Sequence, residues 1–230
     1  MVREIVLDTE TTGLDPKSGD KVVEIGCVEL ADHFPTGRTW HQYINPQRDM
    51  PQEALKVHGL SSQFLSDKPV FKAIAEEFLS FISDAVLIIH NASFDVGFLN
   101  HELEACGYSA IGMDRVVDTL MLARRIHPGG ANSLDALCRR YGIDNSARTL
   151  HGALLDSEIL ADVYLELIGG HQAKLDLSQA GKIKSEVVAS ETAIKARPKP
   201  LPGRVTKKEA DDHDAFVATL GEAAIWSRYS

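Results

Sequence analysis

The stretch Ile5-Val6-Leu7-Asp8-Thr9-Glu10-Thr11-Thr12-Gly13 decides the fold prediction for this chain. Its apolar, β-branched run predicts a buried strand at residues 2–7, and the i, i+2 spacing puts Asp8 and Glu10 on one face after it. Two acids this close cannot both ionise cheaply in a dry site, so either one holds a proton or a divalent cation neutralises them. An exposed strand end with two solvated acids would show the same pattern, so the stretch alone leaves both readings open.

Length and composition limit the size of the core and the class of protein. A chain of 230 residues with 44% apolar content can bury one sizeable core and keep residues for a tail. The longest apolar runs, such as residues 85–89, are too short to span a bilayer, and the N-terminus lacks the layout of a signal peptide. We therefore expect a soluble, cytoplasmic protein. Its three cysteines, Cys27, Cys106 and Cys138, form no Cys-x-x-Cys pair and are predicted to be reduced core thiols.

Charge is distributed unevenly along the chain. Residues 1–170 hold 14 Lys/Arg against 25 Asp/Glu, whereas residues 171–230 hold 10 against 8. The overall net charge of -9 argues against a large electrostatic footprint on nucleic acid, but not against a small one. The acidity belongs to the first part of the chain, where bound metal ions would offset some of it.

Hydrophobic periodicity predicts a mixed α/β layered domain over residues 1–170. Strands at 2–7, 22–30 and 39–44 form an antiparallel meander, and strands and helices then alternate. The remaining predicted elements are strands at 85–89 and 115–118, the latter at an edge, and helices at 51–57, 70–83, 94–106 with Ser93 as its cap, 119–126, 133–141 with Gly142 as its stop, and 153–168.

Beyond residue 170 the sequence changes character. Residues 171–211 are predicted to be a flexible linker, because the Lys-, Ala-, Ser- and Pro-rich part of this segment is too poor in apolar residues to fold alone. Residues 212–230 form a separate C-terminal segment that begins with a small amphipathic helix.

Three acidic positions lie at the ends of predicted core elements: Asp8 with Glu10, Asp95 and Asp156. His151 stands five residues before Asp156, which is about 140° away from it on an ideal helix, so we place His151 on the preceding loop. A lone Asp at a helix start is usually a cap, and a lone His is usually structural. Taken together, the five residues indicate a site.

These residues carry a family resemblance. Asp8-Thr9-Glu10, His90-Asn91-Ala92-Ser93-Phe94-Asp95 and His151-x4-Asp156 resemble the three motifs of the DEDD 3′→5′ exonucleases. His151, with Gly152 at the place where the other branch carries tyrosine, is typical of the h branch. The resemblance covers about residues 1–170 and implies an RNase H-like fold, a five-stranded mixed sheet flanked by helices.

The resemblance also implies a chemistry. Phosphodiester hydrolysis needs a deprotonated water and charge relief at phosphorus, which two divalent ions, Mg²⁺ or Mn²⁺, about 4 Å apart supply. Asp8, Glu10 and Asp156 would be the metal ligands, with Asp8 bridging, and Asp95 would act on the second ion through water. His151 would take the proton from the attacking water. The products would be 5′-mononucleotides.

The remaining site residues are implied more loosely. The resemblance suggests that Thr11, Leu14, Glu53, His58 and Phe94, together with Asp8, Glu10 and Asp156, hold the terminal nucleotide. By position alone, Leu14 and Phe94 fit a core equally well. His90 and Asn91 fit a purely structural role in shaping their loop.

Two features point to a replication role. Residues 8–14 and 57–60 are most similar to the proofreading subunits of bacterial replicative DNA polymerases. Residues 172–177 resemble the Gln-x-x-Leu-x-Phe peptide that binds the sliding clamp, with Gln172, Leu175 and Leu177 as its anchors and Leu177 replacing the usual aromatic residue. The C-terminal segment would bind the polymerase catalytic subunit through anchors on one helix: Phe216, Leu220 and Trp226.

Two other functions stay open. An RNA 3′-end-trimming exonuclease of the same superfamily would share the motifs, although the long tail speaks against it. A bridging module between polymerase and clamp, with vestigial acids, would share the tail but would not need all five motif residues. Mismatch preference, Mg²⁺ versus Mn²⁺, and binding of a small accessory subunit do not follow from the sequence.

Overall fold

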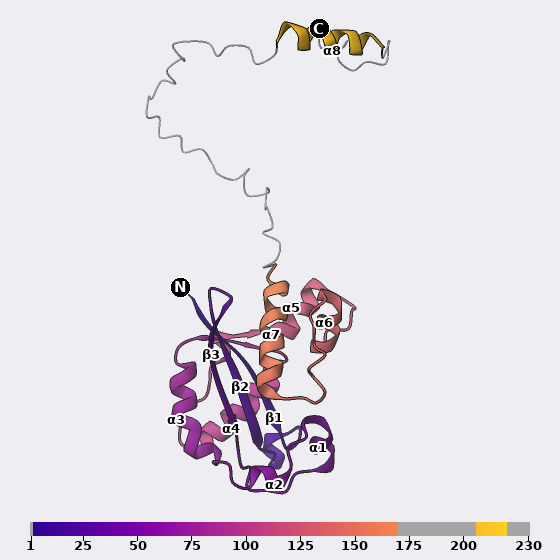
Figure 1. Cartoon of the computed structure of the whole chain (residues 1–230). Coiled ribbons are helices and arrows are strands. Elements are labelled where there is room, and N and C mark those ends of the chain that lie inside the picture. The colour runs from indigo at the N-terminus through magenta and orange to yellow at the C-terminus, as the bar shows by residue number, and fades with distance from the viewer. Residues whose placement is uncertain (1, 170–205, 220–230) are drawn as a thin grey trace, which may run out of the picture. The chain divides into compact units, whose positions relative to one another are not determined.

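The computed structural model describes residues 2–169 and residues 206–219, which belong to two separate units. The first unit is built on a five-stranded sheet with the order β3-β2-β1-β4-β5 (Figure 1). β1 pairs with β2 and β2 with β3 in antiparallel fashion, whereas β4 runs parallel to both β1 and β5. The strands are β1 (Arg3–Thr11), β2 (Val22–Ala31), β3 (Phe34–Tyr43), β4 (Val86–Ile89) and β5 (Val116–Asp118). This confirms the predicted mixed α/β architecture.

In the described part of the chain, helices cover the sheet through three hydrophobic clusters, two of which are large. Ile5 and Leu7 of β1 belong to the core that includes α3 and α4, while Val6 belongs to the core that includes α6 and α7. Because side chains alternate along a strand, Asp8 and Glu10 lie on the face of Val6. Figure 1 shows α7 lying along β1 and β2. The helices of this unit are α1 (Gln52–His58), α2 (Ser62–Leu65), α3 (Phe71–Ile82), α4 (Ala92–Ala105), α5 (Thr119–Ile126), α6 (Leu134–Tyr141) and α7 (Ala153–Leu167), with short 3₁₀ turns η1 (Pro16–Ser18) and η2 (Met113–Arg115).

The first strand is longer than predicted. The expectation that it ends at residue 7 is wrong, because β1 stays paired with β2 as far as Thr11, opposite Val22. The register shifts between Glu10 and Thr11. Asp8 and Glu10 therefore lie on the strand itself, where its backbone hydrogen bonds fix their positions.

The third strand is also longer, and it begins at Phe34 rather than at residue 39. A two-residue turn at Asp32 and His33, with φ of 49° and 74°, joins β2 to β3. Such turns usually carry Gly, so the Asp-His pair gave no signal. Pro35 within the strand also favours a loop, but β3 is an edge strand, where proline is tolerated.

The start of α4 is capped differently from the prediction. Ser93 lies inside the helix, and the N-cap residue is Asn91, with φ of 65°. The carboxylate of Asp118, at the end of β5, accepts hydrogen bonds from the backbone N–H groups of Asn91 (3.3 Å) and Ala92 (3.2 Å). A distant residue supplies the cap, so the local sequence could not reveal it.

The other helix ends follow the sequence closely. α1 includes His58, one residue beyond the predicted end, and stops at Gly59, with φ of 75°. α2 was not predicted, although Ser61 caps it by accepting a hydrogen bond from the N–H of Phe64. Gly142 ends α6 in the left-handed conformation, with φ of 69°, as predicted.

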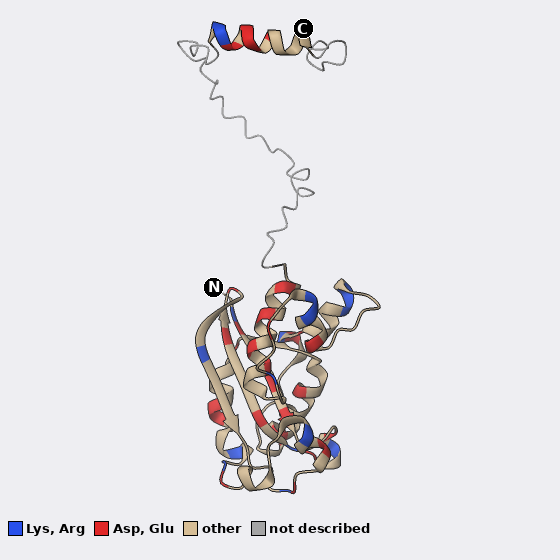
Figure 2. Ribbon diagram, turned by 45° about the vertical axis from the view of Figure 1, so that its right-hand side comes forward, with Lys and Arg blue, Asp and Glu red and all other residues tan. Residues whose placement is uncertain are grey.

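The second unit contains α8 (Lys207–Thr219), which begins before the predicted start at residue 212. Thr206 and Glu209 form a reciprocal capping box, with the Glu209 N–H donating to Thr206 Oγ1 and the Thr206 N–H donating to the Glu209 carboxylate. The Thr-x-x-Glu spacing is the signal that would have placed this start. Figure 2 shows a basic first turn followed by acidic residues. Of the predicted partner-binding residues, Phe216 is exposed on α8, and the following lie outside the described residues: Gln172, Leu175, Leu177, Leu220 and Trp226.

Two predictions from composition can be compared with the structure. No helix within residues 2–169 or 206–219 is long and apolar enough to cross a membrane. Cys27, Cys106 and Cys138 are free thiols, as expected, and two of them are buried.

Candidate active site

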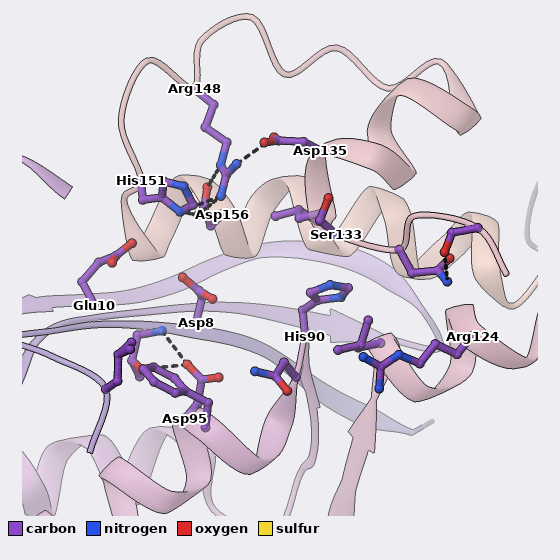
Figure 3. A pocket seen from close by; sticks show the side chains of 18 of the residues that line it. Asp8, Glu10, His90, Asp95, Arg124, Ser133, Asp135, Arg148, His151 and Asp156 are labelled. Carbon is purple, nitrogen blue, oxygen red and sulfur yellow. Dashed lines mark hydrogen bonds and ion pairs between the residues drawn. The ribbon is translucent and has the colours of Figure 1, made fainter. Parts of the chain in front are cut away.

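A cavity of about 980 Å³ lies where β1 and β4 end, between α4 and α7. All five motif residues line it: Asp8, Glu10, Asp95, His151 and Asp156. Figure 3 shows the four carboxylates converging from the strand and from two helices, with His151 above them. Residues separated by more than a hundred positions in the chain thus meet at one place.

Gly26 on β2 allows Asp156 to approach Asp8. Gly26 pairs directly with Asp8 in the sheet. A Cβ atom at this position would lie 2.2 Å from the backbone nitrogen of Leu154, in the first turn of α7. Ser157 Oγ donates a 3.0 Å hydrogen bond to the carbonyl oxygen of Gly26 and fixes this close contact. The missing side chain lets the start of α7, which carries Asp156, pack onto the sheet beside Asp8.

Asp95 is held by the strand that carries the first two acids. Its Oδ1 accepts hydrogen bonds from the backbone N–H of Thr9 (3.0 Å) and from Thr9 Oγ1 (2.7 Å). Thr9 points to the opposite face of β1 from Asp8 and Glu10. The first turn of α4 is therefore tied to β1 at the cavity, which places Asp95 beneath Asp8.

His151 lies on the loop before α7, as predicted, and its side chain is 46% exposed. Its backbone N–H donates a 3.1 Å hydrogen bond to the carbonyl oxygen of Val57, near the end of α1. The ring Nδ1 lies 3.4 Å from Asp156 Oδ2. The imidazole therefore stands at the rim of the cavity, on a loop that its backbone hydrogen bond anchors.

Three of the four acids in the cavity have raised pKa values. Burial, followed by the charges of Asp95, Glu10 and Asp156, raises the pKa of Asp8 well above its ordinary value. Burial also raises the pKa of Glu10 to about 8, with further contributions from Asp156 and Glu24. For Asp95, burial outweighs the hydrogen bonds from Thr9 and raises the pKa to about 7. Burial and mutual repulsion therefore disfavour the charged forms of these acids, and a bound cation would offset that cost.

Asp156 is the exception, because an arginine that the sequence reasoning missed neutralises it. Arg148 Nε and Nη2 donate to Asp156 Oδ1 (2.5 Å) and Oδ2 (2.6 Å). Burial tends to raise the pKa of Asp156, but the contacts with His151 and Arg148 lower it by more. Arg148 Nη1 also donates to Asp135 Oδ1, at 2.7 Å. The only available signal was an arginine three residues before His151, and that signal is weak.

The donor set fits a divalent cation. Among the described residues, ligand atoms of Glu10, His151 and Asp156 all lie within 4.8 Å of one another. Asp8 faces the same space, and burial, followed by the charges of the neighbouring acids, raises the pKa values of Asp8 and Glu10. Clustered carboxylate oxygens are the ligands that Mg²⁺ and Mn²⁺ prefer.

The residues expected to hold a nucleotide divide into two groups. Leu14 is 84% exposed at the cavity, so the core alternative is wrong for this residue. Phe94 lines the cavity and also packs against Phe98. His90 and Asn91, which also fit a purely structural role, line the cavity too.

The remaining three predicted contacts do not line the cavity. Thr11 Oγ1 donates to the carbonyl oxygen of Gly13, and Glu53 is exposed on α1. His58 is buried at the end of α1, where its Nδ1 accepts a hydrogen bond from the N–H of Leu60. Their roles in substrate binding stay predictions.

The RNase H-like sheet and the acidic cavity at its end define a nuclease. A family model described as Exonuclease matches residues 5–164. DNA polymerase III subunit epsilon of Rickettsia conorii is 46% identical over 226 residues, which cover 97% of this chain and 98% of that protein. The chain therefore belongs to the exonuclease family, in the group of DNA polymerase III epsilon subunits, and it is a 3′→5′ exonuclease.

Solved structures agree with this assignment. Exonuclease X in complex with 5′ overhanging duplex DNA is 26% identical, with a TM-score of 0.57, and the match covers 73% of this chain and 92% of that one. The nuclease domain of 3′hExo, a DEDDh family member bound to rAMP, has a TM-score of 0.63 over the same shares. At 15% identity, the second likeness shows the fold alone. Exonucleases of the DEDDh type typically use divalent metal ions, in keeping with the donor set.

Proposed function

We propose that this chain is the proofreading exonuclease of a replicative DNA polymerase, releasing 5′-mononucleotides from the 3′ end of DNA. The observation that carries the proposal is the meeting of Asp8, Glu10, Asp95 and Asp156 in one cavity with His151 at its rim. The near full-length similarity to a DNA polymerase III subunit epsilon supports the replication role.

Each motif residue has a part in this proposal. Asp8, Glu10 and Asp156 would hold two divalent ions, Mg²⁺ or Mn²⁺, and Asp95 would support the second ion. Once bound, the ions supply charge neutralisation at the scissile phosphate and at the attacking and leaving oxygens. His151 would take the proton of the attacking water, which requires a neutral imidazole with a free lone pair. The exposed position of His151 allows it to pass that proton to solvent.

The rim of the cavity would grip the last nucleotide. Leu14 offers an exposed apolar side chain and Phe94 an aromatic ring, and both line the cavity. Apolar and aromatic surfaces suit a flat base with any sequence. Such contacts need a base that is not paired. They therefore suit a frayed 3′ end better than a duplex end.

A primer assay tests the substrate. The full chain with Mg²⁺ is given equal amounts of 3′-labelled DNA and RNA of the same sequence, and a DNA duplex with one 3′ mispair beside its matched form. We expect faster release from the DNA and from the mispaired end, and no release in EDTA. Preference for the RNA end would instead support the RNA-trimming alternative.

The domain organisation is a second part of the proposal. We propose that residues 1–170 act as the exonuclease domain, that residues 171–211 connect it to the C-terminal segment, and that residues 212–230 bind the polymerase catalytic subunit. The exposed Phe216 on α8 is the described anchor of that contact. The sliding clamp is a further proposed partner, through residues 172–177.

Truncation separates these parts. A chain ending at Ser178 should keep its exonuclease rate on single-stranded DNA and lose capture by the purified polymerase subunit. Phe216→Ala should weaken that capture in the full chain, while Lys207→Ala on the same helix serves as a matched control. Undiminished capture of the truncated chain would remove the polymerase-binding role from the tail.

A further inference from the structure

Arg148 is the one cation in direct contact with the acidic cluster among the described residues, and it is buried there. Its side chain is 8% exposed and that of Asp156 is 4% exposed, whereas Asp135, its third partner, is 44% exposed. The guanidinium thus bridges a buried carboxylate inside the site and a half-exposed one at its edge. Figure 3 shows Arg148 reaching down from the loop between α6 and α7 to both.

The contact with Asp156 uses both oxygens of the carboxylate. Nε and Nη2 of Arg148 form a two-pronged pair with Oδ1 and Oδ2. Such a pair takes up the open edge of the carboxylate, which is where a cation would otherwise bind. Among Asp8, Glu10, Asp95 and Asp156, only Asp156 pairs with an arginine in the described part of the chain.

The same guanidinium also contacts the proposed general base, His151. Arg148 Nη2 lies 2.8 Å from His151 Nδ1. Because a guanidinium only donates hydrogen bonds, Nδ1 must be the acceptor, and its lone pair faces Arg148. That lone pair is the one needed to take a proton from water. In this arrangement Arg148 holds two of the three groups that form the candidate cation cluster, Asp156 and His151.

We propose that Arg148 is a resident counter-cation that exchanges with the metal. It neutralises Asp156 and covers the lone pair of His151. Arg148 would leave Asp156 when a metal binds there, and it would stay attached to the loop edge through Asp135. The exchange would release the base in the same step that fills the metal site. This inference rests on the proposed function, because it needs the metal to bind at Asp156.

Metal affinity gives the first test. In calorimetric titrations of the full chain with Mn²⁺, Arg148→Lys and Arg148→Gln should each bind about tenfold more tightly than the unchanged chain, because neither can form the two-pronged pair that the metal must break. Lysine keeps the positive charge. Simple charge repulsion between arginine and metal would therefore leave Arg148→Lys at the original affinity and would contradict the exchange.

A matched control comes from the far end of the same sheet. Arg38 pairs with the nearly buried carboxylate of Glu29, at 3.0 Å, and does not line the cavity. Arg38→Lys should leave the Mn²⁺ affinity unchanged. If the unchanged chain binds no Mn²⁺, the proposed function itself fails; if it binds and Arg148→Lys binds equally or more weakly, only the exchange fails.

A second measurement needs no variant. In ¹⁵N spectra of the full chain, the Nε–H signal of Arg148 should be shifted by its hydrogen bond and protected from solvent exchange when metal is absent. Saturating Mg²⁺ should remove that shift and protection, while the signal of Arg38 stays in place. An Arg148 signal that does not respond to Mg²⁺ would overturn the proposal.

Discussion

Asparagine in place of Asp8 is expected to lower the rate of nucleotide release by at least about a thousandfold. Asp8 lines the cavity, where burial and then the charges of the three other carboxylates raise its pKa. An amide of the same shape cannot supply the negative charge that holds a divalent ion. The measurement is the single-turnover rate on a 5′-labelled DNA strand at saturating Mg²⁺.

The same substitution should stabilise the metal-free protein at neutral and alkaline pH. A carboxyl whose pKa is raised on folding contributes stability at low pH, and that contribution is lost as the pH rises through its folded pKa. The pKa of Asp95 is raised to about 7 and that of Glu10 to about 8. The free energy of unfolding should therefore fall as the pH rises toward 8. Removing the charge of Asp8 relieves this repulsion.

Thermal melts in EDTA at about pH 5 and pH 8 check this sign. The unchanged chain should lose melting temperature between the two values, and Asp8→Asn should lose less. Asp114→Asn, at an exposed position outside the cavity, is the control and should follow the unchanged chain. An Asp8→Asn protein that keeps its rate within tenfold would remove Asp8 from the metal site.

Replacing His151 with alanine should lower the rate by about 10²- to 10⁴-fold, the usual contribution of a general base. Mn²⁺ affinity should change little, because the carboxylates remain. A large loss of affinity would instead make His151 a metal ligand, as its place in the cluster with Glu10 and Asp156 also allows.

The pH profile separates a general base from a structural role. The rate of the unchanged chain should rise in a step with pH, as a general base requires, and His151→Ala should lose that step. His213→Ala, an exposed histidine on α8, should keep the step. Equal rates for His151→Ala and the unchanged chain across about pH 6 to 9 would exclude His151 as the base.

The parts of the site that the sequence predicted are those fixed by local pattern. Asp8 and Glu10 follow an apolar run, Asp95 opens a helix after a buried strand, and the five-residue gap placed His151 on a loop. The parts that it missed depend on contacts between distant segments. Gly26 matters because α7 passes over it, and Asp118 caps α4 from another strand.

Arg148 shows the same limit at the centre of the site. In the sequence it is one basic residue in a polar loop, with no periodicity to mark its direction. Its importance comes from the loop turning back over α7, where Asn145 and Arg148 both donate to Asp135. Only the folded chain shows that an arginine lies on the carboxylate expected to bind metal.

The most direct measurement is the anomalous scattering of Mn²⁺ soaked into crystals of the full chain. We expect two peaks about 4 Å apart in the cavity, both within bonding distance of Asp8, and at least one in contact with Asp156. A cavity without Mn²⁺ at saturating concentration, or peaks bound only to acids elsewhere on the surface, would contradict a metal-dependent exonuclease built on these residues.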